Sequence, residues 1–206
     1  MIPWARPKLT KKDLAHLNRA FKSNWISGGQ YISKLENILK NIFKEKNILV
    51  TSSGTAAIHL AYLAIGLKDG DEIIVPGYGY LAAANIAKLF GLKILFADVD
   101  PNTFCTTEKT IKKAITKKTK AIVIIHTYGN MCEVDKIKRL TRKRKIILIE
   151  DAAEAFGSKF KNKFSGTIGD VGIYSFQATK TITTGEGGAI VVKEKKKFER
   201  LKLFRS

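Results

Sequence analysis

The chain has 206 residues, of which 45% are hydrophobic, and its formal net charge is +19. This length and this apolar fraction suit a single domain over residues 1–206, and no apolar run approaches the roughly 20 residues of a membrane-spanning helix. The two cysteines, Cys105 and Cys132, have neither a CxxC spacing nor a disulfide-rich framework, which argues against a zinc site and predicts a reducing, cytoplasmic setting.

The first third of the chain predicts two amphipathic helices followed by a strand and an apolar helix. Thr10 is a suitable N-cap for the first helix, and apolar residues follow it at helical spacing. The glycines of Trp-Ile-Ser-Gly-Gly then interrupt the pattern. The predicted elements are a proline-marked arm over 3–7, a helix from Thr10, a break at 25–29, a helix over 31–43, a strand over 47–51 and a helix over 56–65.

From Asp71 onward, strand-like and helix-like segments alternate regularly. The strands are continuous apolar runs, which indicates burial on both faces and therefore a mostly parallel sheet covered by helices on both sides. The predicted strands are 72–75, 93–97, 121–125, 146–149, 171–176 and 189–192; the helices are 81–90, 108–115, 134–141 and 193–206; a small hairpin falls within 157–169.

The net charge of +19 would suit a protein that binds nucleic acid, with a steep salt dependence of affinity. The basic residues are mostly lysines, however, and their runs fall at predicted helix ends and turns. Aromatic residues do not alternate with them as in a base-stacking surface. We therefore expect solvated lysine-rich faces and no nucleic-acid partner, with nucleic-acid binding as the less favoured alternative.

Two reactive side chains follow strands whose carboxyl ends should meet at one edge of the sheet. Asp151 follows the apolar run 146–149, and a carboxylate buried there must be paired with a positive group such as a protonated pyridine nitrogen. Lys180 lies among the hydroxyl residues and glycines of 175–188, where a purely solubilising charge is unexpected. A lysine amine can form a Schiff base with an aldehyde, so the pair predicts a site for pyridoxal phosphate.

Three further groups suit the rest of that cofactor. Ser53-Gly54-Thr55 opens a predicted helix, whose N-terminal amides favour a phosphate, and Ser175 can donate to the same phosphate. Tyr80 could lie flat on a heteroaromatic ring. Each also has a simpler interpretation, because the serine segment and Asp151 are ordinary helix N-caps and Tyr80 could be a core aromatic, with Tyr78 an equal candidate.

Ordered motifs along nearly the whole chain resemble the DegT/StrS-type family of pyridoxal-phosphate-dependent nucleotide-sugar aminotransferases. Asp-Ala-Ala-Glu at 151–154 with Lys-Thr-Ile-Thr-Thr-Gly-Glu-Gly-Gly at 180–188 is most similar to the perosamine-synthase branch, which acts on a GDP-linked 4-keto-6-deoxymannose. The other motifs are Trp25-Ile-Ser-Gly28, Ser53-Gly-Thr-Ala-Ala-Ile-His-Leu-Ala61, Gly70-Asp-Glu-Ile-Ile-Val-Pro76, Asp98-Val-Asp-Pro101 and Ile115-Thr-Lys-Lys-Thr-Lys-Ala-Ile122.

The resemblance implies the large domain of the aspartate-aminotransferase architecture. It implies transfer of an amino group, from an amino-acid donor expected to be glutamate, to the keto carbon of a nucleotide-linked 4-keto-6-deoxysugar for polysaccharide (O-antigen) biosynthesis. It also implies a homodimer with sites at the subunit interface. The implied roles are the covalent bond to the cofactor for Lys180, the pyridine nitrogen for Asp151, a place beside the ring for Glu154, ring stacking for Tyr80, and the phosphate for Gly54, Thr55 and Ser175.

The sequence departs from the family in two places. Gly77 and Gly79 replace bulkier residues before Tyr80, and the chain stops where family members continue into a smaller C-terminal domain, so we expect that domain to be missing. Two alternatives to an active aminotransferase follow. One is an inactive or regulatory remnant, and the other is a sugar dehydratase on the same scaffold, against which Lys180 argues because such relatives commonly carry histidine there.

Overall fold

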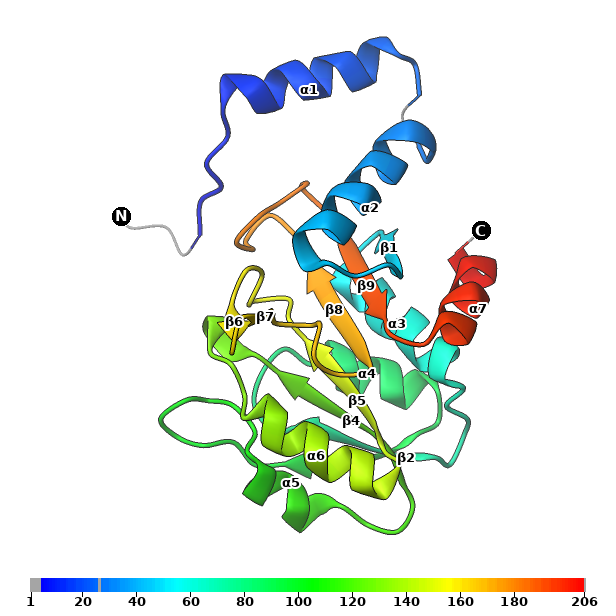
Figure 1. Cartoon of the computed structure of the whole chain (residues 1–206), viewed down its shortest axis with the longest axis vertical. Helices are drawn as coiled ribbons and strands as arrows, with labels where there is room; N and C mark the ends of the chain where they lie inside the picture. Colours follow the sequence, from blue (N-terminus) through cyan, green and yellow to red (C-terminus); the bar gives the residue numbers. More distant parts are fainter. Residues whose placement is uncertain (1–4, 26, 206) are drawn as a thin grey trace.

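A computed structural model describes residues 5–25 and 27–205, so the predictions made for residues 3–4, 26 and 206 lie outside it. Figure 1 shows a twisted central sheet flanked by helices. The strands are β1 (Ile48–Thr51), β2 (Glu72–Pro76), β3 (Lys93–Ala97), β4 (Thr119–Ile125), β5 (Ile147–Asp151), β6 (Lys159–Phe160), β7 (Lys163–Phe164), β8 (Val171–Ser175) and β9 (Gly188–Val192). The α-helices are α1 (Lys11–Lys22), α2 (Gly29–Phe43), α3 (Gly54–Ile65), α4 (Ala82–Leu89), α5 (Glu108–Ala114), α6 (Val134–Arg144) and α7 (Lys195–Arg205), and a 3-10 turn η1 spans Thr127–Gly129.

The main sheet has the strand order β1-β9-β8-β5-β4-β2-β3. The strands from β8 to β3 all run parallel, and β9 alone runs antiparallel to both of its neighbours. The prediction of a mostly parallel sheet is therefore confirmed. β6 and β7 form the small hairpin expected within 157–169.

Helices cover both faces of this sheet, as predicted. The first core cluster joins α3, α4 and α7 to one face of the sheet, and the second joins α5 and α6 to the other. A third cluster packs α2 against β1, β8 and β9. The alternation of side chains along a strand explains the division, because Ile73 and Val75 of β2 belong to the first cluster while Ile74 belongs to the second.

The expectation that the strands are buried on both faces is wrong for one strand, and one helix packs on no part of the core. β3 is an apolar run but lies at the edge of the sheet, where Phe96 is 60% exposed. α1 forms at Thr10 with the expected cap, yet none of its residues is buried, and Figure 1 shows it standing away from the sheet. Among the described helices, none combines the length and apolarity that a bilayer crossing requires.

Candidate functional site

The strand register gathers several chain segments at one edge of the sheet. Gly188, the first residue of β9, lies opposite both Thr51 at the end of β1 and Ser175 at the end of β8. Asp151, the last residue of β5, pairs in register with Ile173 of β8. All seven predicted site residues line one cavity of about 480 Å³ at this edge, namely Gly54, Thr55, Tyr80, Asp151, Glu154, Ser175 and Lys180.

The N-terminus of α3 forms one wall of the cavity. Ser53 caps the helix, because its Oγ accepts from the Ala56 amide at 3.0 Å and its carbonyl accepts from the Ala57 amide at 3.1 Å. The amides of Gly54 and Thr55 come before these two bonded amides in the first turn of α3 and are available to an anion. The helix-cap and phosphate interpretations are thus compatible, since the cap uses the side chain of Ser53 and leaves the first amides to a ligand.

Two glycines allow the helix to approach the strands this closely. A Cβ added at Gly54 would lie 3.0 Å from the Cβ of Ser175. A Cβ added at Gly188 would lie 2.5 Å from the backbone carbonyl of Ser53, a contact that real structures do not tolerate. The Ser175 hydroxyl therefore lies directly beside the start of α3, at the place where a phosphate would use both.

Asp151 supplies a buried carboxylate to the cavity. Its residue is only 5% exposed, and Oδ1 accepts from the Ala153 amide at 3.0 Å. None of the described residues donates a hydrogen bond to Asp151 Oδ2. Every fully buried side-chain nitrogen or oxygen of the described residues has a hydrogen-bond partner, so Oδ2 is accessible and faces the cavity that Asp151 lines. Burial raises the pKa of Asp151 above its ordinary value, while the Ala153 amide and the positive charge of nearby Lys180 oppose that rise. No helix follows at 152–154, so the helix N-cap alternative for Asp151 is wrong.

Lys180 enters the cavity from the loop between β8 and β9. Its backbone amide donates to the Gln177 carbonyl at 2.9 Å, and its side chain is 22% exposed. The Lys180 Nζ donates to Glu154 Oε1 at 3.3 Å, and Glu154 Oε2 accepts from the Tyr128 amide at 3.1 Å. Glu154 therefore belongs to the cavity and orients the lysine, and its anchor is an amide 26 residues away that no local sequence signal indicates.

Tyr80 lines the cavity at its rim, because the residue is 77% exposed. Gly79 before it has φ +130°, and a Cβ there would lie 2.7 Å from Ile125 Cδ1. The positive φ and the close approach of Ile125 therefore both favour glycine at position 79, where the sequence departs from the family. Tyr78, the alternative candidate, is outside the lining of this cavity and instead pairs its hydroxyl with that of Tyr128 at 3.0 Å.

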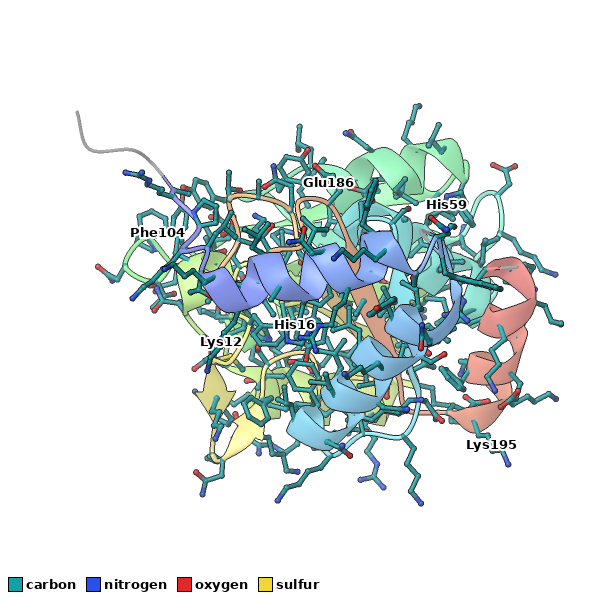
Figure 2. The ribbon with its side chains drawn as sticks, turned by 90° about the horizontal axis from the view of Figure 1, so that it is seen from above. Lys12, His16, His59, Phe104, Glu186 and Lys195 are labelled. Carbon is teal, nitrogen blue, oxygen red and sulfur yellow. The ribbon has the colours of Figure 1, made fainter. Side chains whose placement is uncertain are left out.

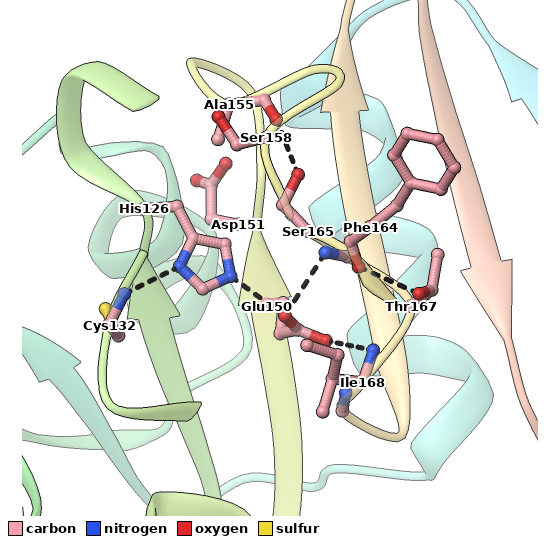
Figure 3. A network of polar contacts seen from close by, with 12 residues as sticks. His126, Cys132, Glu150, Asp151, Ala155, Ser158, Phe164, Ser165, Thr167 and Ile168 are labelled. Carbon is pink, nitrogen blue, oxygen red and sulfur yellow. Dashed lines mark hydrogen bonds and ion pairs between the residues drawn. The ribbon is translucent and has the colours of Figure 1, made fainter. Parts of the chain in front are cut away.

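A buried polar network behind the cavity was not predicted (Figure 3). The Glu150 carboxylate is fully buried and accepts from the amides of Gly166, Ile168 and Gly169. His126 Nε2 lies 2.8 Å from Glu150 Oε2, while its Nδ1 accepts from the Cys132 amide at 3.2 Å, so Nε2 carries the proton and donates. The His126 amide also donates to the Asp151 carbonyl at 3.0 Å, which ties the network to the end of β5. The one sequence signal was a carboxylate directly after an apolar strand, which requires partners.

Comparisons with known proteins agree with this geometry. Residues 7–206 match the DegT/DnrJ/EryC1/StrS aminotransferase family. The GDP-perosamine synthase of Escherichia coli O157:H7 is 44% identical over 200 residues, covering 97% of this chain and 55% of that protein. The chain therefore spans about half the length of the curated relatives it matches.

Solved structures give the same fold. The E. coli GDP-4-keto-6-deoxy-D-mannose-3-dehydratase with bound hydrated PLP superposes with a TM-score of 0.93 at 31% identity, over 98% of this chain and 54% of that one. An aminotransferase from Psychrobacter cryohalolentis superposes with a TM-score of 0.91 at 31% identity, over 98% and 51% of the two chains. The chain belongs to the DegT/DnrJ/EryC1/StrS aminotransferase family.

Proposed function

We propose that this chain is the cofactor-binding part of a pyridoxal-phosphate-dependent aminotransferase that acts on a nucleotide-linked 4-keto-6-deoxysugar. One observation carries the proposal: the amine of Lys180, the open oxygen of Asp151 and the N-terminus of α3 belong to a single cavity of about 480 Å³. A cofactor with an aldehyde, a protonated ring nitrogen and a phosphate is complementary to these three groups. The close approach of α3 and β8 at Gly54 leaves a cradle beside Ser175 that suits the phosphate.

The residues of the chain then have distinct tasks. Lys180 would hold the cofactor through its Nζ and would move a proton at that atom, while Glu154 holds the nitrogen in place. Asp151 keeps the ring nitrogen protonated, Tyr80 covers the ring from the rim, and Gly54, Thr55 and Ser175 bind the phosphate. When bound, the cofactor supplies an electron sink for the carbon that loses or gains the amino group.

The substrate proposal rests on the relatives. The perosamine synthase of E. coli O157:H7 shares 44% of its residues with this chain over the matched part, and we extend its GDP-linked sugar class to this protein. Glutamate is the proposed amino donor, and the aminated sugar would enter a surface polysaccharide such as O-antigen. A homodimer in the cytoplasm completes the proposal, supported by the exposed apolar face of α1 and by two free, buried cysteines.

The dehydratase alternative has the same scaffold, since a solved dehydratase superposes with a TM-score of 0.93. Lys180 favours amino transfer, because its Nζ would hold the cofactor covalently and would also supply the proton acceptor and donor that amino transfer requires. Release of a dehydrated sugar without consumption of an amino donor would favour the alternative instead.

Borohydride reduction tests the proposed role of Lys180. Pyridoxal phosphate added to the purified chain should give a visible absorbance band, and reduction should fix the cofactor on the peptide that contains Lys180. Lys180→Ala should abolish this adduct, whereas Lys163→Ala on the β6–β7 hairpin should leave it unchanged. An adduct on another lysine, or no absorbance with the wild-type chain, would overturn the assignment.

A further inference from the structure

A second cavity, of about 650 Å³, adjoins the first. It lies between the N-terminal arm, residues 5–9, and the loop 178–183 that carries Lys180. Thr179 and Lys180 line both cavities. A ligand with its reacting end at Lys180 could therefore extend into the second space, whose volume lies in the range of about 300–1,000 Å³ typical of small-molecule sites.

The second cavity has a cationic lining. Arg6 and Lys8 come from the arm, and neither forms an ion pair or side-chain hydrogen bond with any other described residue. Among the described residues that line the cavity, the one acidic side chain is that of Asp13, whose Oδ2 accepts from both the amide and the hydroxyl of Thr10 at 2.7 Å. The carboxylate is thus engaged in capping α1, and the two arm cations remain available to an anion.

Polar groups on the opposite wall complete the lining. Thr179 and Thr183 donate their hydroxyls to Gln177 Oε1 and to the Phe176 carbonyl, whereas the Thr181 hydroxyl makes no hydrogen bond within the described chain. Pro7 fixes its own φ and favours an extended backbone at Arg6. The arm therefore presents its charges on a short, stiff segment opposite an unused hydroxyl.

We propose that the second cavity is the subsite for the diphosphate of the nucleotide-sugar substrate, with Arg6 and Lys8 as its phosphate-binding residues. The inference rests on the proposed function, because it places the sugar at Lys180 and the diphosphate one cavity further out. A guanidinium binds two phosphate oxygens at once, and an ammonium adds a point charge. A hydroxyl such as that of Thr181 can donate to a third oxygen.

Binding of GDP tests this subsite without any turnover. The affinity for GDP is measured by calorimetry on the 206-residue chain saturated with pyridoxal phosphate, so that the cofactor's own phosphate does not compete. The Arg6→Gln/Lys8→Gln variant should bind GDP about tenfold or more weakly, and the dependence of its affinity on salt should be shallower. Guanosine, which lacks the diphosphate, should bind the two proteins equally.

The matched control is Lys11→Gln/Lys12→Gln, which removes the same charge from exposed positions of α1 outside the cavity. It should keep the wild-type affinity for GDP. Equal loss in both variants, unchanged affinity in the arm variant, or tighter binding of a single-stranded oligonucleotide than of GDP would overturn the inference. The absorbance of the bound cofactor distinguishes the proposed cofactor site from the proposed diphosphate subsite. If the cofactor band forms but the Arg6→Gln/Lys8→Gln variant binds GDP as tightly as wild type, only the subsite is refuted.

Discussion

At the residue scale, Asp151 combines a functional position with a cost to stability. Its carboxylate is buried, and burial raises its pKa above the ordinary value. Between the unfolded pKa of about 3.9 and the higher folded value, the native state holds more protons, so stability falls as pH rises through that interval. Without the cofactor, none of the described residues places a positive group in hydrogen-bond contact with the ionised Asp151 carboxylate.

Asp151→Asn should therefore stabilise the cofactor-free chain at pH 7 by about 0.5–2 kcal/mol, as replacements at strained functional sites commonly do. The amide keeps the oxygen that accepts from Ala153, and it removes the charge. Urea unfolding at pH 7 and at pH 3.5 measures the effect, and the difference from wild type should vanish at the lower pH. The same variant should lose cofactor absorbance.

Asp135→Asn is a control for which the expected change in stability at pH 7 has the opposite sign. A hydrogen bond from Lys161 lowers the pKa of Asp135, so its ionised form contributes stability that is lost as pH falls through the folded pKa. This variant should be slightly less stable than wild type at pH 7. A less stable Asp151→Asn at pH 7 would contradict the account of the buried carboxylate.

At the element scale, the contact between β9 and the N-terminus of α3 depends on Gly188. A Cβ there would lie 2.5 Å from Ser53 backbone atoms and 2.7 Å from the Gly54 nitrogen, none of which can rotate away. Gly188→Ala should destabilise the chain by about 1–3 kcal/mol, the usual cost of overpacking, and should weaken cofactor binding by displacing the helix amides. Thermal unfolding and cofactor titration measure the two effects.

Gly77→Ala is the matched control for that change. An added Cβ at Gly77 meets only the Ala97 carbonyl oxygen at an ordinary 3.5 Å, and its φ lies outside the left-handed region. It should therefore change neither unfolding nor cofactor affinity. Wild-type cofactor affinity in Gly188→Ala would show that the helix does not depend on this close approach.

The elements themselves were largely predictable, because apolar periodicity is a local signal. The apolar run of β5 and the hydroxyl-rich loop around Lys180 both indicated the site, and the structure brings their side chains to one cavity. The antiparallel direction of β9, the exposed position of β3 and the anchoring of Glu154 by Tyr128 were not predictable, since each depends on contacts between distant segments. Glu150 had a visible signal, but its partner His126 is 24 residues away.

At the scale of the whole molecule, positive charge is spread over the chain: Lys12 and Lys195 lie far apart in the view of Figure 2. α1, which carries Lys12 and His16 in that view, exposes an apolar stripe instead. Leu14, Leu17 and Phe21 are 56%, 65% and 75% exposed. A solvent-exposed stripe of this kind on a helix with no buried residue indicates a surface that another molecule covers.

The proposed homodimer accounts for this stripe and can be tested there. Analytical ultracentrifugation of the wild-type chain should give twice the 22.9 kDa mass of one chain. The Leu17→Glu/Phe21→Glu variant should give the mass of a monomer, because each copy would have to bury two charges at the interface. The control Lys12→Glu/His16→Glu introduces two glutamates on the opposite face of α1, and this variant should remain a dimer. Because no residue of α1 is buried in the single chain, the thermal stability of the monomeric variant should match wild type at concentrations where both are monomers. A wild-type chain that is monomeric at micromolar concentration, or a dimer that survives both glutamates, would show that α1 is not the interface.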